Sequence, residues 1–402
     1  MSFDKVEIPY GCYWSTPFAK WQGSLQYLHA MRFAAHVCKA EMAKREIAPE
    51  MFDFGVMGTT LTQYQSFYGA PWPLYEMGLK HVAGPTVHQV CATGPRVVLT
   101  AAAEIQVGMA TCAMAFATDR CSNGSHIYYP NPRGMGGTGQ NEDPMVFNFT
   151  SDAIGGHSML ETAEKVAKKY NITTEEQHEV VLRRFHQYQD AVAHGHAFHK
   201  RFMTLPFPVP KPNFNGVEKM LEGDEGIFDQ DADKLKKLKP NVVGGTVTFG
   251  GQTHPADGNC GVILATPEKA RDLSRDRNIR VRIRGFGQGR VEMSWMPLAP
   301  IAATKKVLEL TGLKIDQMKA VKSHNPFAVN DIAFARETGY DLMNINNYGC
   351  SLIWGHPQGP TGMRVIIELI EELALKGGGL GLFQGCAAGD TSLACVIEVS
   401  DR

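Results

Sequence analysis

The chain has 402 residues, of which 44% are apolar and 20% are charged, a composition typical of a soluble globular protein. Its formal net charge of −1 excludes bulk electrostatic attraction to nucleic acid or to an anionic membrane, and no apolar run approaches the length that spans a bilayer. The first residues lack the apolar core of a signal peptide, and the nine cysteines form no C-x-x-C pair or zinc-type spacing. We therefore expect free thiols, no metal site, no membrane segment and a cytoplasmic location.

Strands and helices alternate in the first third of the chain. An apolar segment leads to Cys91, and apolar residues then recur at helical spacing. Such alternation predicts a largely parallel α/β sheet. The expected elements are a short strand within residues 1–25, a helix over 26–48, a strand over 53–58, a loop over 59–73, a short helix over 74–81, the strand before Cys91, a helix over 96–108 and a strand over 111–117.

The pattern changes between residues 123 and 251. Residues 123–150 are rich in Gly, Pro and Asn, and residues 199–240 mix Pro, Lys and Asp without a clear period. Between them, residues 161–170 and 174–194 predict helices, the second capped by Thr173 or Thr174. We interpret this segment as a long insertion, after which strands resume near 245–248 and at 261–265.

The final third repeats the layout of the first. A strand leads to His324, a Gly-rich turn contains His356, and Cys386 lies between the last two strands. Two similar strand–turn–helix halves suggest an internal duplication. The expected elements are strands over 279–284 and 319–322, helices over 300–310 and 361–375, and strands over 381–383 and 393–399.

Cys91 is the first candidate for a functional residue. A cysteine at a strand-to-helix turn lies at a helix N-terminus, whose partial positive charge and free N–H groups lower a thiol's pKa. The small residues after it, including Gly94, would let a substrate carbonyl approach the backbone. A buried structural cysteine is the alternative interpretation.

Three motifs in order resemble the thiolase family, whose members make or break 3-oxoacyl-CoA thioesters. Cys91-Ala92-Thr93-Gly94 is similar to the family's C-A-S-G, and residues 355–364 (GHPQGPTGMR) are similar to its G-H-P-x-G-A-S-G-x-R. Cys386 stands where the family has the cysteine of C-x-G-G-G. The chain departs from the family at His324-Asn325-Pro326-Phe327, which replaces N-E-A-F and indicates a divergent branch.

The resemblance implies a five-layered αβαβα fold built from two duplicated halves. The first half would span residues 1–122, completed by about 252–275; the inserted loop domain would span 123–251; the second half would span 276–402. It implies an acyl-CoA:CoA C-acyltransferase, active in fatty-acid or aromatic-acid degradation. It also implies a dimer or tetramer.

The resemblance also implies roles for individual residues. Cys91 would carry the acyl group, His356 would accept its proton, and Cys386 would act as acid and base on the carbon between the carbonyls. His324 would donate to the enolate oxygen, or else be a histidine bonded to backbone at a strand end. The co-substrate coenzyme A, with no permanently bound cofactor, would contact four further residues: Met159, Thr253, Phe327 and Ala388.

Other features leave the substrate and the partners open. The acidic stretch 224–233 lacks the arginine that grips the CoA phosphates in relatives, so Arg183, Arg184, Lys200 or Arg201, or a second subunit, would have to replace it. The His324-Asn325 departure also resembles branches that pair with a small zinc-binding, OB-fold subunit.

A catalytically weak acyl-CoA-binding scaffold is the alternative function. A bulky or aromatic substrate such as benzoylsuccinyl-CoA is suggested by five aromatic residues: Tyr68, Trp72, Tyr75, Tyr348 and Trp354.

Overall fold

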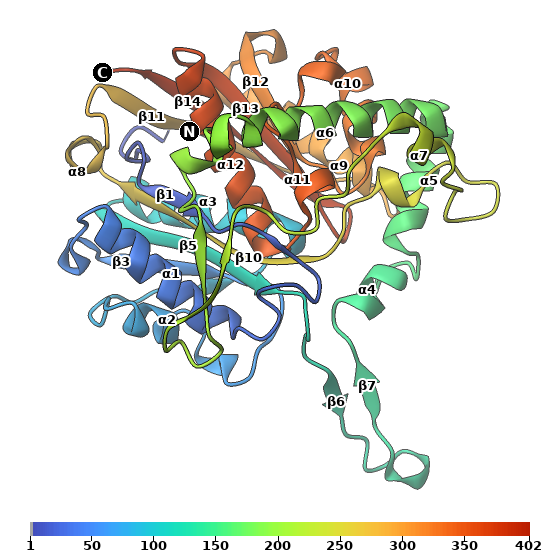
Figure 1. Cartoon of the computed structure of the whole chain (residues 1–402), viewed down its shortest axis with the longest axis horizontal. Coiled ribbons are helices and arrows are strands. Elements are labelled where there is room, and N and C mark those ends of the chain that lie inside the picture. The colour runs from blue at the N-terminus through green and yellow to red at the C-terminus, as the bar shows by residue number, and fades with distance from the viewer. Residues whose placement is uncertain (1–2) are drawn as a thin grey trace.

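Two β-sheets form the frame of the chain, and residues 3–402 are described by a computed structural model (Figure 1). The first sheet has the order β1-β10-β5-β3-β4, with β2 also paired to β10. In it, β10 runs antiparallel to β1 and β5, whereas β3 is parallel to β4 and β5. Its strands are β1 (Tyr13–Ser15), β2 (Ala19–Lys20), β3 (Phe54–Gly58), β4 (Thr86–Val87), β5 (Cys112–Arg120) and β10 (Ala256–Ala265).

The second sheet repeats this arrangement with the order β11-β14-β13-β12. Here β14 runs antiparallel to β11 and β13, and β13 is parallel to β12. The matching pattern supports the internal duplication. Its strands are β11 (Ile279–Arg290), β12 (Met318–His324), β13 (Gly379–Ala387) and β14 (Thr391–Asp401).

Both sheets are mixed, so the prediction of a largely parallel sheet is wrong. The turn between β13 and β14 spans only residues 388–390, and a connection this short can join only antiparallel strands. In the first sheet, β10 follows the insertion and runs antiparallel beside β5. Alternating strands and helices therefore indicated the sheet content correctly but not every strand direction.

Helices α3 (Thr93–Gln106) and α12 (Gly359–Leu375) pack between the two sheets and touch each other. Nearly every residue of α12 is buried, because a helix in a central layer faces protein on all sides. Other helices cover the outer faces, so the fold has five layers, as expected (Figure 1). These are α1 (Ala30–Lys44), α2 (Pro71–Glu76) and α8 (Pro267–Leu273) on the first sheet, and α9 (Ala299–Thr311) and α10 (Ala328–Thr338) on the second.

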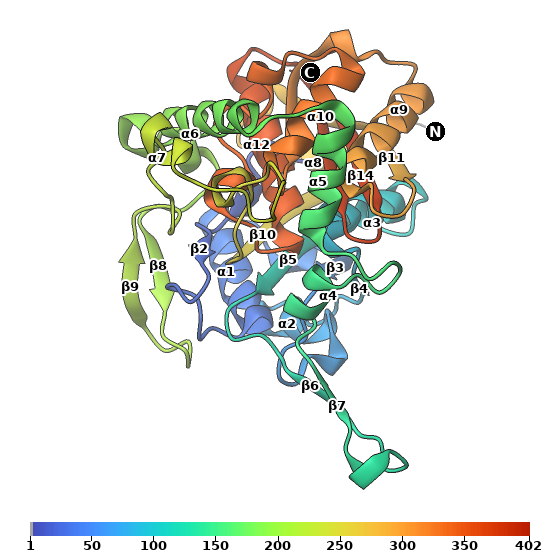
Figure 2. The ribbon, with the colours of Figure 1, turned by 90° about the vertical axis from the view of Figure 1, so that its right-hand side faces the viewer.

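The segment between β5 and β10 lies outside both sheets. Its β6–β7 hairpin projects away from the body, and its helix α6 lies across the second half (Figures 1 and 2). Thr173 caps α6 by accepting from the Glu176 N–H at 3.2 Å, as predicted. The elements are β6 (Ile127–Tyr129), β7 (Gln140–Glu142), α4 (Val146–Thr150), α5 (Met159–Tyr170), α6 (Thr174–His196), β8 (Phe207–Pro210), β9 (Val217–Leu221) and α7 (Ala232–Lys236).

Several local predictions differ from the structure. Residues 245–248 form no strand, because the Glu164 carboxylate takes the N–H groups of Thr246 and Val247 in place of a neighbouring strand. The helix expected over 74–81 starts earlier, at Pro71, a residue suited to the first helical turn. The helix expected over 26–48 spans only Ala30–Lys44. No helix within residues 3–402 is long and apolar enough to cross a membrane.

Candidate active site

Cys91 lies between strand β4 and helix α3, in a short 3-10 turn over Val90–Ala92. The predicted strand-to-helix turn is confirmed, although α3 begins at Thr93 and not at Arg96. The preceding residue, Val90, has φ +48°, an unfavourable conformation for a β-branched side chain. Backbone strain of this kind tends to accumulate at functional sites, where surrounding contacts hold it.

The N-terminal ends of α3 and α12 meet beside Cys91. A Cβ atom on Gly94 would lie 2.5 Å from the Gly359 carbonyl oxygen and 2.7 Å from the Met363 nitrogen. Only glycine allows the two helices to approach this closely. Gly94 therefore brings the segment that contains His356 and Gln358 against the turn that contains Cys91.

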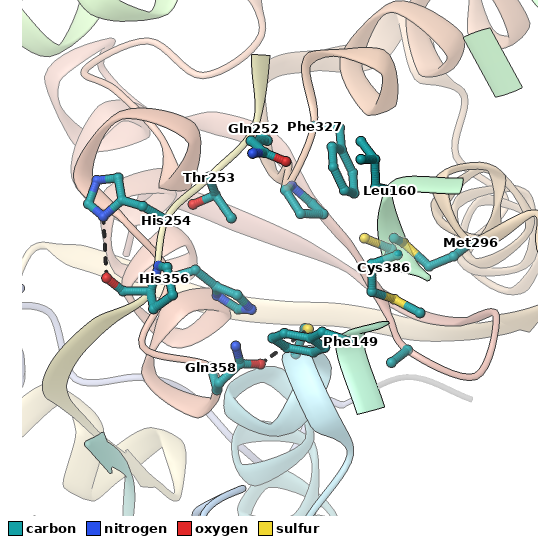
Figure 3. Close-up of a pocket in the computed structure, with 15 residues that line it drawn as sticks. Phe149, Leu160, Gln252, Thr253, His254, Met296, Phe327, His356, Gln358 and Cys386 are labelled. Atoms are coloured by element: carbon teal, nitrogen blue, oxygen red, sulfur yellow. Dashed lines mark hydrogen bonds between the residues drawn. The ribbon is translucent and has the colours of Figure 1, made fainter. Parts of the chain in front are cut away.

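A cavity of about 240 Å³ opens at this meeting point (Figure 3). Cys91, His356 and Cys386 line it together, although they lie far apart in the sequence. The four residues predicted to contact the co-substrate also line it: Met159, Thr253, Phe327 and Ala388. The remaining wall is mostly apolar and comes from Phe149, Leu160, Gln252, His254, Pro255, Met296, Pro326 and Gln358.

His324 and His356 stack on each other, with ring centroids 4.2 Å apart. His356 Nδ1 bonds to Thr361 Oγ1 at 2.6 Å, and His324 Nδ1 bonds to Ser351 Oγ at 2.9 Å. The Nε2 atom of each ring is buried and has no hydrogen-bond partner in the described part of the chain. Each Nε2 is therefore the atom left to bind substrate or to move a proton.

His324 itself does not line the cavity, because it lies at the end of β12 and is almost fully buried. Its ring nitrogen nevertheless lies within 4.8 Å of both Cys91 Sγ and a ring nitrogen of His356. These three donors could hold a soft metal ion such as zinc if Cys91 were ionised.

Cys386 lies near the end of β13, where its sulfur accepts a hydrogen bond from Asn330 Nδ2 at 3.5 Å. Asn330 belongs to α10, so the outer helix layer of the second half orients this thiol. The neighbouring Ala388 directs its backbone N–H toward Cys91, which lowers the thiol's pKa.

Burial nevertheless raises the pKa of Cys91 to about 12, more than the N–H groups of Ala388 and Cys91 itself can offset. The expectation that the helix N-terminus would hold a thiolate is therefore wrong for the free protein. Burial also raises the pKa of Cys386, lowers that of His324 to about 3, and lowers that of His356, with the nearby His324 contributing. The resting site holds two neutral thiols and two neutral imidazoles.

A second cavity of about 160 Å³ adjoins the first, and the two share Gln252 and His254. Phe228 and Phe249 line it, with ring centroids 6.2 Å apart. Lys234 lines it too and contacts Asp229 and Asp231 at 3.3 and 3.2 Å. The spacing of acids and lysines in the sequence did not single out Lys234.

The four cations suggested as phosphate ligands lie elsewhere. Arg184 is buried against Asp331, and Arg183 donates to the Met343 carbonyl. Arg201 pairs with Glu371, and Lys200 lines a different hollow beside it. All four belong to α6 or to the turn that follows it, and the three arginines bind the insertion to residues of the second half.

The first two acids of the stretch 224–233 do not face the second cavity. Asp224 forms a buried ion pair with Arg364 on α12 at 2.6 Å. Glu225 accepts from the backbone N–H of Ser24 at 2.7 Å. The negative charge of the stretch 224–233 is therefore partly compensated by internal contacts of Asp224 and Glu225.

The five aromatic residues taken as signs of a bulky substrate do not line the first cavity. Trp354 is buried against Phe18 and Arg364, and Tyr348 stacks on Phe198 with centroids 3.9 Å apart. Tyr68 and Tyr75 are exposed, and Trp72 packs beside His29. The prediction that these five aromatic side chains flank a bulky acyl group is therefore wrong.

Sequence reasoning missed several residues of the site. Gln358 contacts Cys91, with Sγ 3.5 Å from Oε1, and Phe149 and Met296 supply much of the apolar wall. Gln358 could have been found from its place inside the G-H-P motif. Phe149 carries no such signal, because it comes from the irregular insertion.

Two family descriptions match the chain: "Thiolase, N-terminal domain" over residues 14–268 and "Thiolase, C-terminal domain" over residues 277–399. Among curated relatives, the acetyl-CoA acetyltransferase of Chromobacterium violaceum is 31% identical, covering 95% of this chain and 97% of the relative. The acetyl-CoA acetyltransferase of Escherichia coli is 29% identical, with 95% and 96% covered.

Solved structures give the same picture. Human mitochondrial 3-ketoacyl-CoA thiolase superposes with a TM-score of 0.89 at 25% identity, covering 99% of this chain and all of that one. The Bacillus anthracis acetyl-CoA acetyltransferase superposes with a TM-score of 0.87 at 26% identity, covering 99% of both chains.

Proposed function

The chain belongs to the thiolase family, and from that membership we propose that it cleaves a 3-oxoacyl-CoA with CoA, or runs the reverse condensation, through an acyl-Cys91 intermediate. Its activity is that of an acyltransferase, with coenzyme A as co-substrate. The observation that carries the proposal is the convergence of Cys91, Cys386 and His356 on one cavity, with His324 behind them.

The first half-reaction would begin with Cys91 attacking the 3-keto carbonyl. Because thiol and imidazole are both neutral at rest, the proton would pass to His356 Nε2 as the sulfur attacks. The oxyanion formed on the attacked carbonyl would be held by the backbone N–H groups of Cys91 and Ala388. Both N–H groups act on the Cys91 sulfur in the free protein, which supports this assignment.

Cleavage of the bond between carbons 2 and 3 would then leave the shortened acyl group on Cys91 and release the enolate of the CoA thioester that carries carbons 1 and 2. Its thioester oxygen would be held by His356, now protonated, and by Nε2 of His324. Cys386 would protonate the enolate carbon, and its high pKa keeps it a proton donor at neutral pH. In the second half-reaction CoA would attack acyl-Cys91, with the same groups moving protons in reverse.

The two adjoining cavities suggest how CoA would bind. The pantetheine arm would pass Gln252, Thr253 and His254, which line the approach to Cys91. The nucleotide would lie in the second cavity between Phe228 and Phe249, near Lys234. One related solved structure is described as a human mitochondrial 3-ketoacyl-CoA thiolase in complex with CoA, at a TM-score of 0.87.

The acyl group would be apolar and uncharged. Phe149, Leu160, Met296 and Phe327 supply the wall, and no lysine or arginine lines the first cavity among residues 3–402. Benzoylsuccinyl-CoA carries a free carboxylate, for which the described lining offers no lysine or arginine, so we rank it below simple 3-oxoacyl chains.

We also propose a homodimer or homotetramer in the cytoplasm. Strand β4 is a sheet edge, and the loop before it exposes Tyr64, Phe67 and Tyr68. An open edge beside exposed aromatic side chains is normally covered by another chain. A small zinc-binding, OB-fold partner subunit is a weaker proposal, since internal pairing of Asp224 and Glu225 removes part of its motivation.

A thiolysis assay over a series of 3-oxoacyl-CoA substrates tests the function and the acyl preference together. The proposal expects turnover, with efficiency rising from acetoacetyl-CoA to longer apolar chains. Efficiency highest with acetoacetyl-CoA would overturn the acyl preference alone. No thiolysis with any chain length would favour the scaffold alternative, an acyl-CoA-binding protein of low activity.

A further inference from the structure

We propose that Gln358 is a further catalytic residue that acts on Cys91 directly: its side-chain Oε1 accepts a hydrogen bond from the thiol at rest, and its Nε2–H donates one to the sulfur once the proton has moved to His356. The proposal rests on the proposed function, in which Cys91 is the nucleophile. It adds to that function a second group, besides His356, that touches the reacting sulfur.

The contact lies in the wall of the cavity and is largely buried. Cys91 Sγ donates to Gln358 Oε1 at 3.5 Å, the bond that the dashed line at Gln358 marks in Figure 3. Gln358 is only 3% exposed. Gln358 follows His356 by two residues and lines the same cavity. The amide therefore lies beside both the nucleophile and its base, where water has little access to replace it.

The backbone of Gln358 is held in a strained conformation. Its φ of +56° and ψ of −103° are unfavourable for a residue with a side chain. Asp119 fixes the next residue, since its Oδ2 accepts from the Gly359 N–H at 2.9 Å. An unfavourable backbone conformation that neighbouring hydrogen bonds maintain is typical of functional sites, and here it indicates a functional role for the Gln358 side chain.

Asp119 is itself anchored firmly. Its carboxylate accepts from the N–H groups of Thr60 and Leu61 and from the hydroxyls of Thr59 and Thr60, at 2.8 to 3.1 Å. Thus the loop after β3, the strand β5 and the start of α12 are tied together through one buried carboxylate. This network fixes where the Gln358 amide can reach.

The chemistry follows from the two ends of an amide. Oε1 accepts and Nε2 donates, and a half-turn about the last side-chain torsion exchanges them. With the thiol protonated, Oε1 is the complementary end, as the structure has it. When the proton moves from Sγ to His356, Nε2 becomes the complementary end, and a hydrogen bond to a charged sulfur is the stronger of the two.

Two variants of different chemistry test this. Gln358→Leu removes both ends of the amide, and Gln358→Glu keeps the size but offers a group that donates only while protonated. The readout is the rate of iodoacetamide alkylation at Cys91 from pH 6 to 9, followed by peptide mass. Alkylation of Cys386 in the same digest and thermal unfolding report on general damage, and surface Gln317→Leu is the matched control.

The proposal expects Gln358→Leu to slow Cys91 alkylation about tenfold or more at every pH, the scale of one lost hydrogen bond to a charged group. Gln358→Glu should stay near the parent rate at pH 6 and fall progressively behind as the carboxyl ionises. Parent rates in both variants, or a Gln358→Glu profile parallel to the parent, would overturn it. Because iodoacetamide needs no CoA, this result is independent of whether Cys91 accepts an acyl group from acyl-CoA.

Discussion

The rings of His324 and His356 stack with centroids 4.2 Å apart, each has a ring nitrogen within 4.8 Å of Cys91 Sγ, and the Nε2 atom of each has no hydrogen-bond partner among residues 3–402. Side-chain hydroxyls hold the opposite nitrogens, Ser351 for His324 and Thr361 for His356. Two imidazoles oriented in the same way can bind a single oxygen atom from one side. This pairing distinguishes the site from one with a single catalytic histidine, and it predicts a separable contribution from His324.

Replacing His324 by alanine should reduce thiolysis kcat by about 10²–10³-fold, the usual cost of losing one donor to a developing oxyanion. Acylation of Cys91 should be affected much less, because His356 still accepts the proton. Stopped-flow thiolysis and mass-detected acylation measure the two steps. Ser351→Ala releases the His324 ring and also removes the bonds of this hydroxyl to Asn325, but it keeps the imidazole, so it should give a smaller loss. An equal loss in both steps would contradict the assignment.

Cys386→Ser should still take an acyl group from acyl-CoA but lose the carbon–carbon step by about 100-fold or more, the scale of general acid–base catalysis. The hydroxyl is a weaker acid than the thiol that Asn330 orients. Asn330→Ala is the matched variant, expected to act in the same direction but less strongly. If Cys386→Ser abolished acylation as well, separate roles for the two cysteines would be refuted.

The pH dependence of Cys91 reactivity follows from its raised pKa of about 12 and the lowered pKa of His356. Below its pKa the thiolate fraction grows with pH, so iodoacetamide alkylation of the free protein should rise about tenfold per pH unit from 6 to 9. A thiolate–imidazolium pair would instead give a plateau that begins below pH 7. Such a plateau would show that burial does not control this thiol.

Lys234→Ala should raise the KM for CoA several-fold with little change in kcat, because Lys234 would contact the distant phosphates and not the reacting atoms. Lys236→Ala, its exposed neighbour on α7 paired only with Asp233, is the control. The purified chain alone should bind CoA with micromolar affinity. Weak binding restored by a co-expressed second subunit would support the partner proposal and count against Lys234.

The parts of the site that local motifs encode could be predicted from the sequence. Cys91 lies in a turn followed by small residues and His356 in a Gly-rich turn, each before a helix, and such turns are determined by residues within a few positions. The duplicated fold followed from the repeated strand–turn–helix order. Strand β11 was located but expected to stop at Arg284, whereas it continues through three glycines to Arg290.

The parts that depend on long-range packing could not be predicted. Whether Arg184 faces solvent or Asp331 depends on how α6 packs on α10, and nothing near Arg184 in the chain decides it. The pKa of Cys91 was predicted in the wrong direction for the same reason. A helix N-terminus is a local feature, whereas burial comes from the whole cavity. Phe149 lines the first cavity but comes from a part of the insertion whose sequence shows no hydrophobic periodicity, so no pattern predicted its position.

The central claim is that Cys91 carries an acyl group, and intact-protein mass after incubation with acetyl-CoA or a longer acyl-CoA tests it most directly. The account predicts one acyl adduct per chain, mapped by peptide mass to Cys91, reversed by excess CoA and absent in a folded Cys91→Ala variant. An adduct on another cysteine, an adduct that persists in Cys91→Ala, or no adduct with any acyl-CoA would contradict it.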